Sequence, residues 1–218
     1  AEPGQVVAIV GSTGSGKSTV VKLAERFYDV CEGAVLVDGV DVRAWRQADL
    51  RANFGYVPQK AFLFSGTVRS NIAYGDEAAG EEAIRAALAA AEALSFVEER
   101  DEGLDAPISQ GGANVSGGQR QRLAMARALV RRPRAYLFDD SFSALDYATD
   151  ARVRAALASY AADATQIIVA QRISTVLFAD RIVVLDEGRV AGVGTHGELM
   201  AGCAAYREIA LSQLSEEE

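Results

Sequence analysis

The sequence is poor in the residues that cross-link a chain or bind transition metals. Its 218 residues include two cysteines, Cys31 and Cys203, and a single histidine, His196. The two cysteines lie far apart and the three residues match no metal-ligand spacing, so neither a disulfide framework nor a metal site follows from them. We expect two structural thiols in a reducing compartment.

Long apolar runs and an excess of basic residues are also lacking. No stretch approaches the roughly 18 apolar residues that span a bilayer, and no signal peptide is visible. The formal net charge is −8. Because an acidic surface does not favour a phosphate backbone, nucleic acid is not expected as the main partner. The chain begins without methionine and almost at once enters a predicted strand. We therefore expect a fragment of a longer polypeptide, so the missing membrane segment says little about the parent protein.

The sequence does contain the alternation of a folded α/β protein. Half of its residues are hydrophobic and 24% are charged, and its length suits one large domain or a domain with a smaller lobe. Short β-branched runs predict strands buried on both faces, at 5–10, 34–37, 53–57, 135–138, 166–170 and 181–185. Helices are predicted between them, at 17–27, 80–92, 119–130 and 148–161. This alternation predicts a mainly parallel sheet covered by helices on both faces.

The stretch from about 61 to 130 breaks the alternation. It is mostly helical, with a predicted loop at 101–115, and indicates an inserted α-helical lobe. The remainder, about 1–60 and 131–218, is predicted to form the sheet-containing lobe of the same domain. The acidic end at 214–218 is expected to fray.

A glycine-rich segment between a predicted strand and a predicted helix indicates a phosphate site. Residues 11–18 read GSTGSGKS and fit G-x-x-x-x-G-K-[ST] in the context that this motif requires. Glycines let backbone N–H groups turn toward an anion, and the start of the helix adds the positive end of its dipole. Lys17 can reach the β- and γ-phosphates, and the Ser18 hydroxyl can bind Mg²⁺. The predicted nucleotide-binding residues are Gly11, Ser12, Thr13, Gly14, Ser15, Gly16, Lys17, Ser18 and Thr19.

An apolar run that ends in two acids supplies a candidate second magnesium ligand. Residues 135–140 read AYLFDD, and an acid that follows such a strand anchors Mg²⁺ in P-loop ATPases. We assign this role to Asp139. A helix cap or a turn residue is the alternative interpretation of an acid at a strand end.

Residues 114–122 read NVSGGQRQR and run into a predicted helix. Gly117 and Gly118 free the backbone at the helix start, and Ser116 places a hydroxyl beside those N–H groups. This indicates a second anion site, although one nucleotide does not obviously need both. A plain capped helix start over Ser116–Gln119 is the alternative.

Taken in order, these motifs resemble the nucleotide-binding domain of ABC transporters, and the resemblance covers essentially the whole chain. GSTGSGKS is similar to Walker A, YVPQ to the Q-loop with Gln59, and VSGGQ to the family signature, with Val115 in the place usually held by leucine. YLFDD is similar to Walker B, SALD at 143–146 to the D-loop, and IIVAQR to the switch strand. FLFSGTVRSNI and GTHGEL are typical of the exporter branch.

The resemblance implies a P-loop NTPase with a RecA-like sheet and an inserted helical lobe, in which the first antiparallel strands are largely missing. It also implies an ATP hydrolase that binds ATP and Mg²⁺. The implied metal-binding residues are Ser18, Gln59 and Asp139. In the family, two such domains pair head to tail, and each ATP lies between Walker A of one and the signature of the other. The residues that would serve the partner's nucleotide are Ser116, Gly117, Gly118, Gln119 and Asp146.

The family resemblance further implies partners and a location. The partners would be a second nucleotide-binding domain and a transmembrane domain, at the cytoplasmic face of the cell membrane. The stretch Phe62–Phe64 could dock a coupling helix of that membrane domain, and a core role for its phenylalanines is the alternative. In the family, an aromatic residue stacks on adenine. It lies further before Walker A than the first residue of this sequence does. We therefore expect weaker nucleotide binding by this fragment than by the full domain, and we expect Tyr28 to pack rather than to replace that residue.

Besides Val115, three positions depart from the family pattern. The residue after the Walker B aspartate is usually glutamate and here is Asp140, which is one methylene shorter. The switch position usually holds histidine and here holds Gln171, which cannot exchange a proton near neutral pH. Gln110 stands where exporters often carry a glutamate involved in contact between domains.

Asp140, Gln171 and Gln59 form the predicted catalytic set, and two of its members are altered. This combination resembles the degenerate half of a heterodimeric exporter, which binds ATP, hydrolyses it slowly and completes the active site of a partner that has the usual Glu and His. An ordinary homodimeric ABC ATPase, a non-transport ABC-type ATPase and a module that never hydrolyses ATP are the alternatives.

Overall fold

The computed structural model describes residues 1–214 and contains a six-stranded sheet with the order β10-β9-β1-β8-β7-β4. Its parallel strands are β4 (Phe54–Val57), β7 (Ala135–Asp139), β8 (Thr165–Val169), β1 (Val6–Gly11) and β9 (Arg181–Asp186). The edge strand β10 (Arg189–Gly194) pairs with β9 in the antiparallel sense. The predicted mainly parallel α/β sheet of a P-loop NTPase is therefore confirmed.

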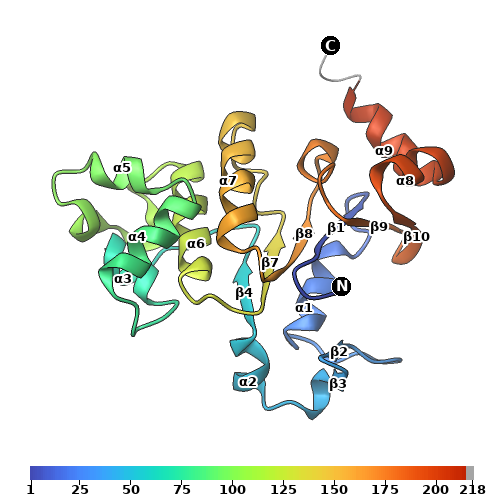
Figure 1. The fold of residues 1–218 in the computed structure, drawn as a ribbon, viewed down its shortest axis with the longest axis horizontal. Helices are drawn as coiled ribbons and strands as arrows, with labels where there is room; N and C mark the ends of the chain where they lie inside the picture. The colour runs from blue at the N-terminus through green and yellow to red at the C-terminus, as the bar shows by residue number, and fades with distance from the viewer. Residues whose placement is uncertain (215–218) are drawn as a thin grey trace.

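Alternate residues along the strands enter two different cores, as the period of a strand requires. On one face, Ala8, Phe138 and Ile168 join a core with Val153 and Leu157 of α7 (Tyr147–Tyr160). On the other face, Ile9, Leu137 and Val169 join a core with Val21 of α1 (Lys17–Ala24) and Leu50 of α2 (Gln47–Ala52). Figure 1 shows α7 and α1 on opposite sides of the sheet. The prediction of burial on both faces is therefore confirmed for the predicted strands that join this sheet.

The stretch from about 61 to 130, which interrupts the alternation of strands and helices, folds beside the β4 edge of the sheet. Figure 1 shows α3 (Val68–Ala73), α4 (Glu81–Ala90), α5 (Leu94–Glu98) and α6 (Gly117–Leu129) gathered there. Buried apolar side chains hold the group together, among them Ile72, Ile84, Leu88, Leu123 and Met125. At the opposite end lie β10, α8 (His196–Gly202) and α9 (Ala204–Leu214). Within residues 1–214, no helix has both the length and the apolar character that a membrane crossing requires.

Several predicted elements differ from the observed ones. The strand predicted at 34–37 does not join the main sheet: β2 (Leu36–Val37) pairs with β3 (Val40–Asp41) in a separate hairpin. The connecting Asp38 and Gly39 have φ of 50° and 76°, the left-handed conformation that a two-residue Asp-Gly turn adopts. The loop predicted at 101–115 contains β6 (Pro107–Ile108), which pairs with β5 (Gly66–Thr67).

Other expectations concern single residues and the chain end. Tyr28 is 62% exposed, so the expectation that it packs is wrong. Cys31 is exposed, Cys203 is buried, and both are free thiols. The strand β10 and the helices α8 and α9 were not predicted. The expected frayed tail lies, apart from Leu214, outside the described residues, and Leu214 ends α9.

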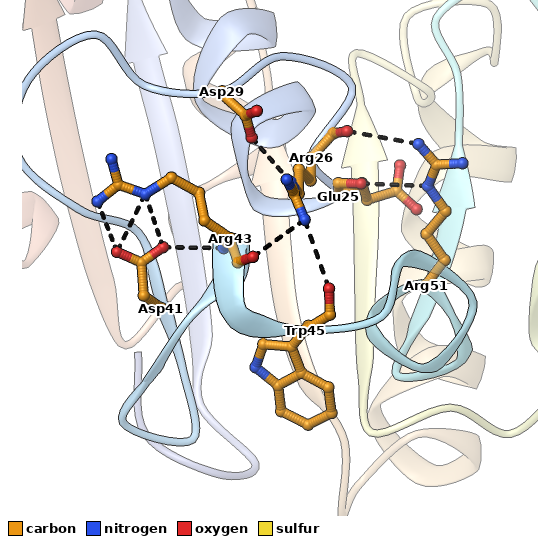
Figure 2. Close-up of polar contacts among 7 residues, drawn as sticks. All are labelled: Glu25, Arg26, Asp29, Asp41, Arg43, Trp45 and Arg51. Carbon is orange, nitrogen blue, oxygen red and sulfur yellow. Dashed lines mark hydrogen bonds and ion pairs between the residues drawn. The ribbon is translucent and has the colours of Figure 1, made fainter.

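Two arginines fix the carboxyl end of α1, the helix that follows the glycine-rich loop (Figure 2). Arg51 of α2 donates from Nε to the carbonyl of Glu25 at 3.2 Å and from Nη2 to the carbonyl of Arg26 at 3.4 Å. Arg26 donates from Nη1 to the carbonyls of Arg43 and Trp45 at 3.3 and 3.4 Å. The Arg51 guanidinium thus binds carbonyls of the kind that a helix end leaves without intrahelical partners, and Arg26 binds carbonyls of the segment before α2. The far end of α1 is thereby tied to the segment that leads into α2.

Glu25 lies within this junction with its side chain out of water. The residue is 5% exposed, and its Oε2 has no hydrogen-bond partner among the described residues. Burial raises the pKa of Glu25 to about 7, against the opposing attraction of Arg51 and Arg131. The folded protein therefore holds the proton of Glu25 more tightly than the unfolded chain does.

Glu25→Gln tests this burial through the pH dependence of stability. The contribution of Glu25 is fully present below its unfolded pKa of 4.5 and is lost as the pH rises through about 7. The glutamine cannot ionise. The free energy of unfolding of Glu25→Gln minus that of the native protein should therefore increase over this range, by on the order of 2–3 kcal/mol. Urea unfolding across the pH range measures it. The exposed Glu32→Gln is the matched control, and parallel pH curves for native protein and Glu25→Gln would contradict the prediction.

Candidate nucleotide site

The glycine-rich loop joins the end of β1 to the start of α1. Gly11 ends the strand so close to β9 that an added Cβ would lie 2.1 Å from the carbonyl oxygen of Leu185. Gly16 is the N-cap of α1 with φ of 97°, a left-handed conformation that glycine adopts without strain. The two glycines therefore allow the loop to pass the sheet edge and to turn into the helix.

The start of α1 is open to an anion. Among the described residues, no side chain caps this helix, so the first N–H groups of α1 are the unpaired donors that every helix start leaves. The hydroxyl of Ser15 is buried and has no hydrogen-bond partner within residues 1–214. Unpaired donors, an orphaned hydroxyl and a helix dipole together fit a phosphate group.

Lys17 is folded back against the loop. Its Nζ donates to the carbonyls of Gly11 and Ser12, both at 2.8 Å, and the residue is 9% exposed. Burial lowers the pKa of Lys17, while the nearby carboxylates of Asp140 and Asp139 oppose the shift. A lysine held by two neutral carbonyls is well placed to transfer those bonds to phosphate oxygens.

Two of the three residues expected to bind magnesium, Ser18 and Asp139, lie next to each other, whereas the side-chain amide of the third, Gln59, donates to Asp140. Ser18 donates from Oγ to Oδ1 of Asp139 at 2.5 Å. Asp139 ends β7 and is buried, and its other oxygen accepts from the hydroxyl of Tyr56 at 3.3 Å. One hydroxyl and one carboxylate fit Mg²⁺, which takes few protein ligands and keeps oxygens of phosphate and water for the rest.

Asp140, the next residue, lies at the floor of the pocket. It is 6% exposed and has a φ of 50°, and its N–H donates to the carbonyl of Val169 at 2.9 Å. Two amides converge on its Oδ2: Gln59 donates from Nε2 at 2.8 Å and Gln171 from Nε2 at 2.7 Å. Burial raises the pKa of Asp140, and the hydrogen bond from Gln59 lowers it in part.

One pocket brings most of the predicted site residues together. It is lined by Thr13, Gly14, Gly16, Lys17, Ser18, Thr19, Gln59, Asp140, Val169 and Gln171. The strand ends explain the convergence, because β1, β4, β7 and β8 are parallel and deliver their following residues to the same edge of the sheet. Gln59 and Gln171 are exposed at the mouth and Asp140 is buried below them.

The signature segment lies outside this pocket. Ser116 and Gln119 form a reciprocal cap at the start of α6: Ser116 Oγ accepts from the N–H of Gln119 at 3.2 Å, and Gln119 Oε1 accepts from the N–H of Ser116 at 3.0 Å. Gly117 between them is exposed. The plain capped helix start is therefore physically present. Asp146 likewise caps α7 by accepting from the N–H of Thr149 at 2.9 Å.

Tyr56 was not among the predicted site residues although its hydroxyl reaches Asp139. The strand register contains the missing signal: Tyr56 of β4 lies opposite Leu137 of β7, and Leu137 and Asp139 share one face of that strand. Burial and the charge of Asp139 raise the pKa of Tyr56 well above its usual range, so the tyrosine stays a neutral donor to the aspartate.

Comparison with known proteins agrees with this arrangement. The sequence model of the ABC transporter family matches residues 1–143. The chain belongs to the ABC transporter family. An ABC transporter ATP-binding protein of Mycobacterium tuberculosis is 53% identical over 216 residues, which are 98% of this chain and 37% of that protein. An ATP-dependent lipid A-core flippase of Albidiferax ferrireducens is 46% identical over 212 residues, 96% of this chain and 36% of the flippase.

A solved structure shares the fold. The structure of a bacterial Atm1-family ABC exporter with ATP bound aligns with a TM-score of 0.94 at 41% identity, over 97% of this chain and 37% of that one. This ABC transporter domain is thus of the exporter type. The chain spans little more than a third of the length of the relatives it matches.

Gln59→Leu tests the electrostatics of the pocket floor. A hydrogen bond donated to a carboxylate stabilises its charged form, so loss of the Gln59 amide should raise the pKa of Asp140 further. The carbon-13 shift of the Asp140 carboxyl, followed against pH, measures this change. Gln47→Leu on the exposed face of α2 is the matched control, and identical titration curves for all three proteins would contradict the prediction.

Proposed function

We propose that this ABC domain binds MgATP at its own Walker site, hydrolyses it slowly, and uses its signature segment to complete the active site of a different partner domain in an exporter. The observation that carries the proposal is the pocket floor, where Asp140 stands in place of glutamate and accepts from two amides at 2.7 and 2.8 Å. Different residues govern binding and turnover at this site.

The residues that would bind the nucleotide are intact. The uncapped start of α1, the Ser15 hydroxyl and the amine of Lys17 supply donors for phosphate oxygens. Ser18 and Asp139 would bind Mg²⁺, with Gln59 close to it at the mouth of the pocket. When bound, Mg²⁺ neutralises charge on the β- and γ-phosphate oxygens.

The residues that would orient the attacking water are altered. Oδ2 of Asp140 already accepts from Gln59 and Gln171, and its shorter side chain sets the carboxylate back from the position of a glutamate. A displacement of about 1 Å can cost on the order of a hundredfold in rate. Gln171 can donate a hydrogen bond to a γ-phosphate but brings no imidazole to the charge that develops during transfer.

The signature segment supports a role toward a second domain. Ser116 and Gly117 are exposed, and they lie outside the pocket of their own chain. The internal cap of Ser116 and Gln119 fixes the conformation of this helix start. Pairing head to tail would bring Ser116, Gly117, Gly118, Gln119 and Asp146 to the partner's nucleotide, as the family pattern implies.

The surface near Phe62–Phe64 supports contact with a membrane domain. Phe62 and Phe64 are 48% and 41% exposed, so the alternative of a core role for these phenylalanines is wrong. Leu63 between them is buried. Arg127 of α6 lies 5.2 Å from the centre of the Phe64 ring and donates to the carbonyl of Phe62 at 2.9 Å. We propose this aromatic surface for a transmembrane domain, which places the chain at the cytoplasmic face of the cell membrane. The exporter relatives do not favour a DNA- or ribosome-directed ATPase.

The slow site is tested by Asp140→Glu combined with Gln171→His in the intact complex. Single-turnover hydrolysis is measured with the partner's own site disabled, and the double variant should be faster by about tenfold to a hundredfold because the base and imidazole are restored. Lys17→Ala in the same background is the control for hydrolysis at this site. An unchanged rate would remove the proposal of a degenerate site.

The heterodimer is tested by affinity purification of the full-length protein from its native membrane, with every co-purifying chain sequenced. A second ABC chain with glutamate after its Walker B aspartate and histidine in its switch is expected. Recovery of this chain alone would favour the ordinary homodimer, and Asp140 and Gln171 would then have to support whatever hydrolysis there is.

A further inference from the structure

The last described helix, α9, is anchored firmly beside the sheet. Tyr206 is fully buried and Ala210 is 3% exposed. The hydroxyl of Tyr206 lies 2.8 Å from Nδ1 of His196 in α8. The helix packs against β1, β9 and the 3-10 turn Ile173–Thr175. Its position relative to the nucleotide edge of the sheet is therefore fixed by buried contacts.

Gln213 extends this buried face toward the pocket. Residues 206, 210 and 213 follow the spacing of one helix face. The amide of Gln213 makes two hydrogen bonds to one backbone segment: Nε2 donates to the carbonyl of Gln171 at 2.6 Å, and Oε1 accepts from the N–H of Ile173 at 2.8 Å. A single side chain thus binds the backbone of the residues before and after Arg172.

The segment that Gln213 holds carries a residue of the nucleotide pocket. β8 ends at Val169, and Ala170 makes the next backbone bond to β1, so the Gln171 backbone lies beyond the strand pairing. The Gln171 side chain in turn donates to Oδ2 of Asp140 at 2.7 Å. Two consecutive contacts therefore link α9 to the pocket floor.

We infer that Gln213 is a positioning residue: it holds the backbone at 171–173 and thereby presents the Gln171 amide to the nucleotide pocket. Fixing a flexible side chain costs conformational entropy. The hydrogen bond from Gln213 to the Gln171 carbonyl restricts the Gln171 backbone before nucleotide binds, and this lowers the entropy cost of fixing the Gln171 side chain. The inference rests on the proposed function in one respect, the binding of the γ-phosphate by Gln171.

Gln213→Met separates hydrogen bonding from packing. Gln213 lines a mainly apolar pocket with Leu177, Met200 and Ala210, so methionine fills the same space but forms neither hydrogen bond. Leu211→Ala, at an exposed position two residues away, is the matched control. Gln213→Ala is the second variant, in case methionine repacks the pocket. All are made in the full-length protein.

Hydrogen exchange tests the contact itself. Loss of the acceptor should speed exchange of the Ile173 amide about fivefold in Gln213→Met and Gln213→Ala, the effect of one hydrogen bond, and Leu211→Ala should leave it unchanged. Unchanged exchange in both Gln213 variants would overturn the inference.

Nucleotide affinity tests the consequence. Gln213→Met should weaken ATP binding about three- to tenfold and leave ADP binding unchanged, because ADP has no γ-phosphate for Gln171 to contact. In a Gln171→Ala background the same change should have no further effect on ATP. Equal weakening for ATP and ADP, or a loss that persists without the Gln171 amide, would mean a merely structural role and would overturn the inference.

The two proposals fail in different ways. If Gln171→Ala alone leaves ATP affinity unchanged, the binding role proposed for Gln171 is wrong, and the exchange of Ile173 alone decides whether Gln213 holds the segment. If Gln171→Ala weakens ATP binding but Gln213→Met does not, the proposed function stands and the positioning role of Gln213 is overturned.

Discussion

The parallel pairing of β4, β7, β8 and β1 is the constraint on which the nucleotide edge depends. Each strand is buried on both faces, so its register cannot slip by one residue without moving an entire apolar set to the wrong side. With that register fixed, residues that follow the strands meet at one edge, among them Thr13, Gln59, Asp140 and Gln171. The polar pocket is therefore a product of the apolar packing beneath it.

A sequence can indicate such an edge when the functional residues directly follow strands. The placement of Lys17, Ser18 and Asp139 at this edge was predictable, because a strand–loop–helix motif and the last residue of a strand each have a fixed direction relative to the sheet. Tyr56 and Gln213 were not. Tyr56 becomes a site residue through the pairing of β4 with β7, and Gln213 through the packing of α9. Both depend on long-range register, which local patterns do not contain.

The errors in predicting the fold have a more local origin. Residues 34–37 have the composition of a buried strand, yet the Asp38–Gly39 turn pairs the observed β2 with β3 outside the main sheet. Tyr28 was expected to pack after the helix predicted at 17–27, yet that helix ends at Ala24 and Tyr28 is exposed. In each case a residue in the left-handed conformation, Asp38 or Arg26, turns the backbone away from the direction that the apolar pattern predicts.

If the proposed function holds, the pocket floor is where binding and turnover are separated. A carboxylate oxygen offers two lone pairs, and Oδ2 of Asp140 receives two N–H donors. Both donors are neutral amides, so they hold the carboxylate in place without a proton to transfer at neutral pH. A carboxylate with one oxygen already occupied by two protein hydrogen bonds has fewer free lone pairs with which to orient water. The phosphate donors of the loop and α1 do not depend on this oxygen. Under the proposed function, the two departures from the family pattern therefore act together. Asp140 is a shorter base than glutamate, and Gln171 helps to immobilise it. The phosphate contacts of the loop and α1 are unaffected.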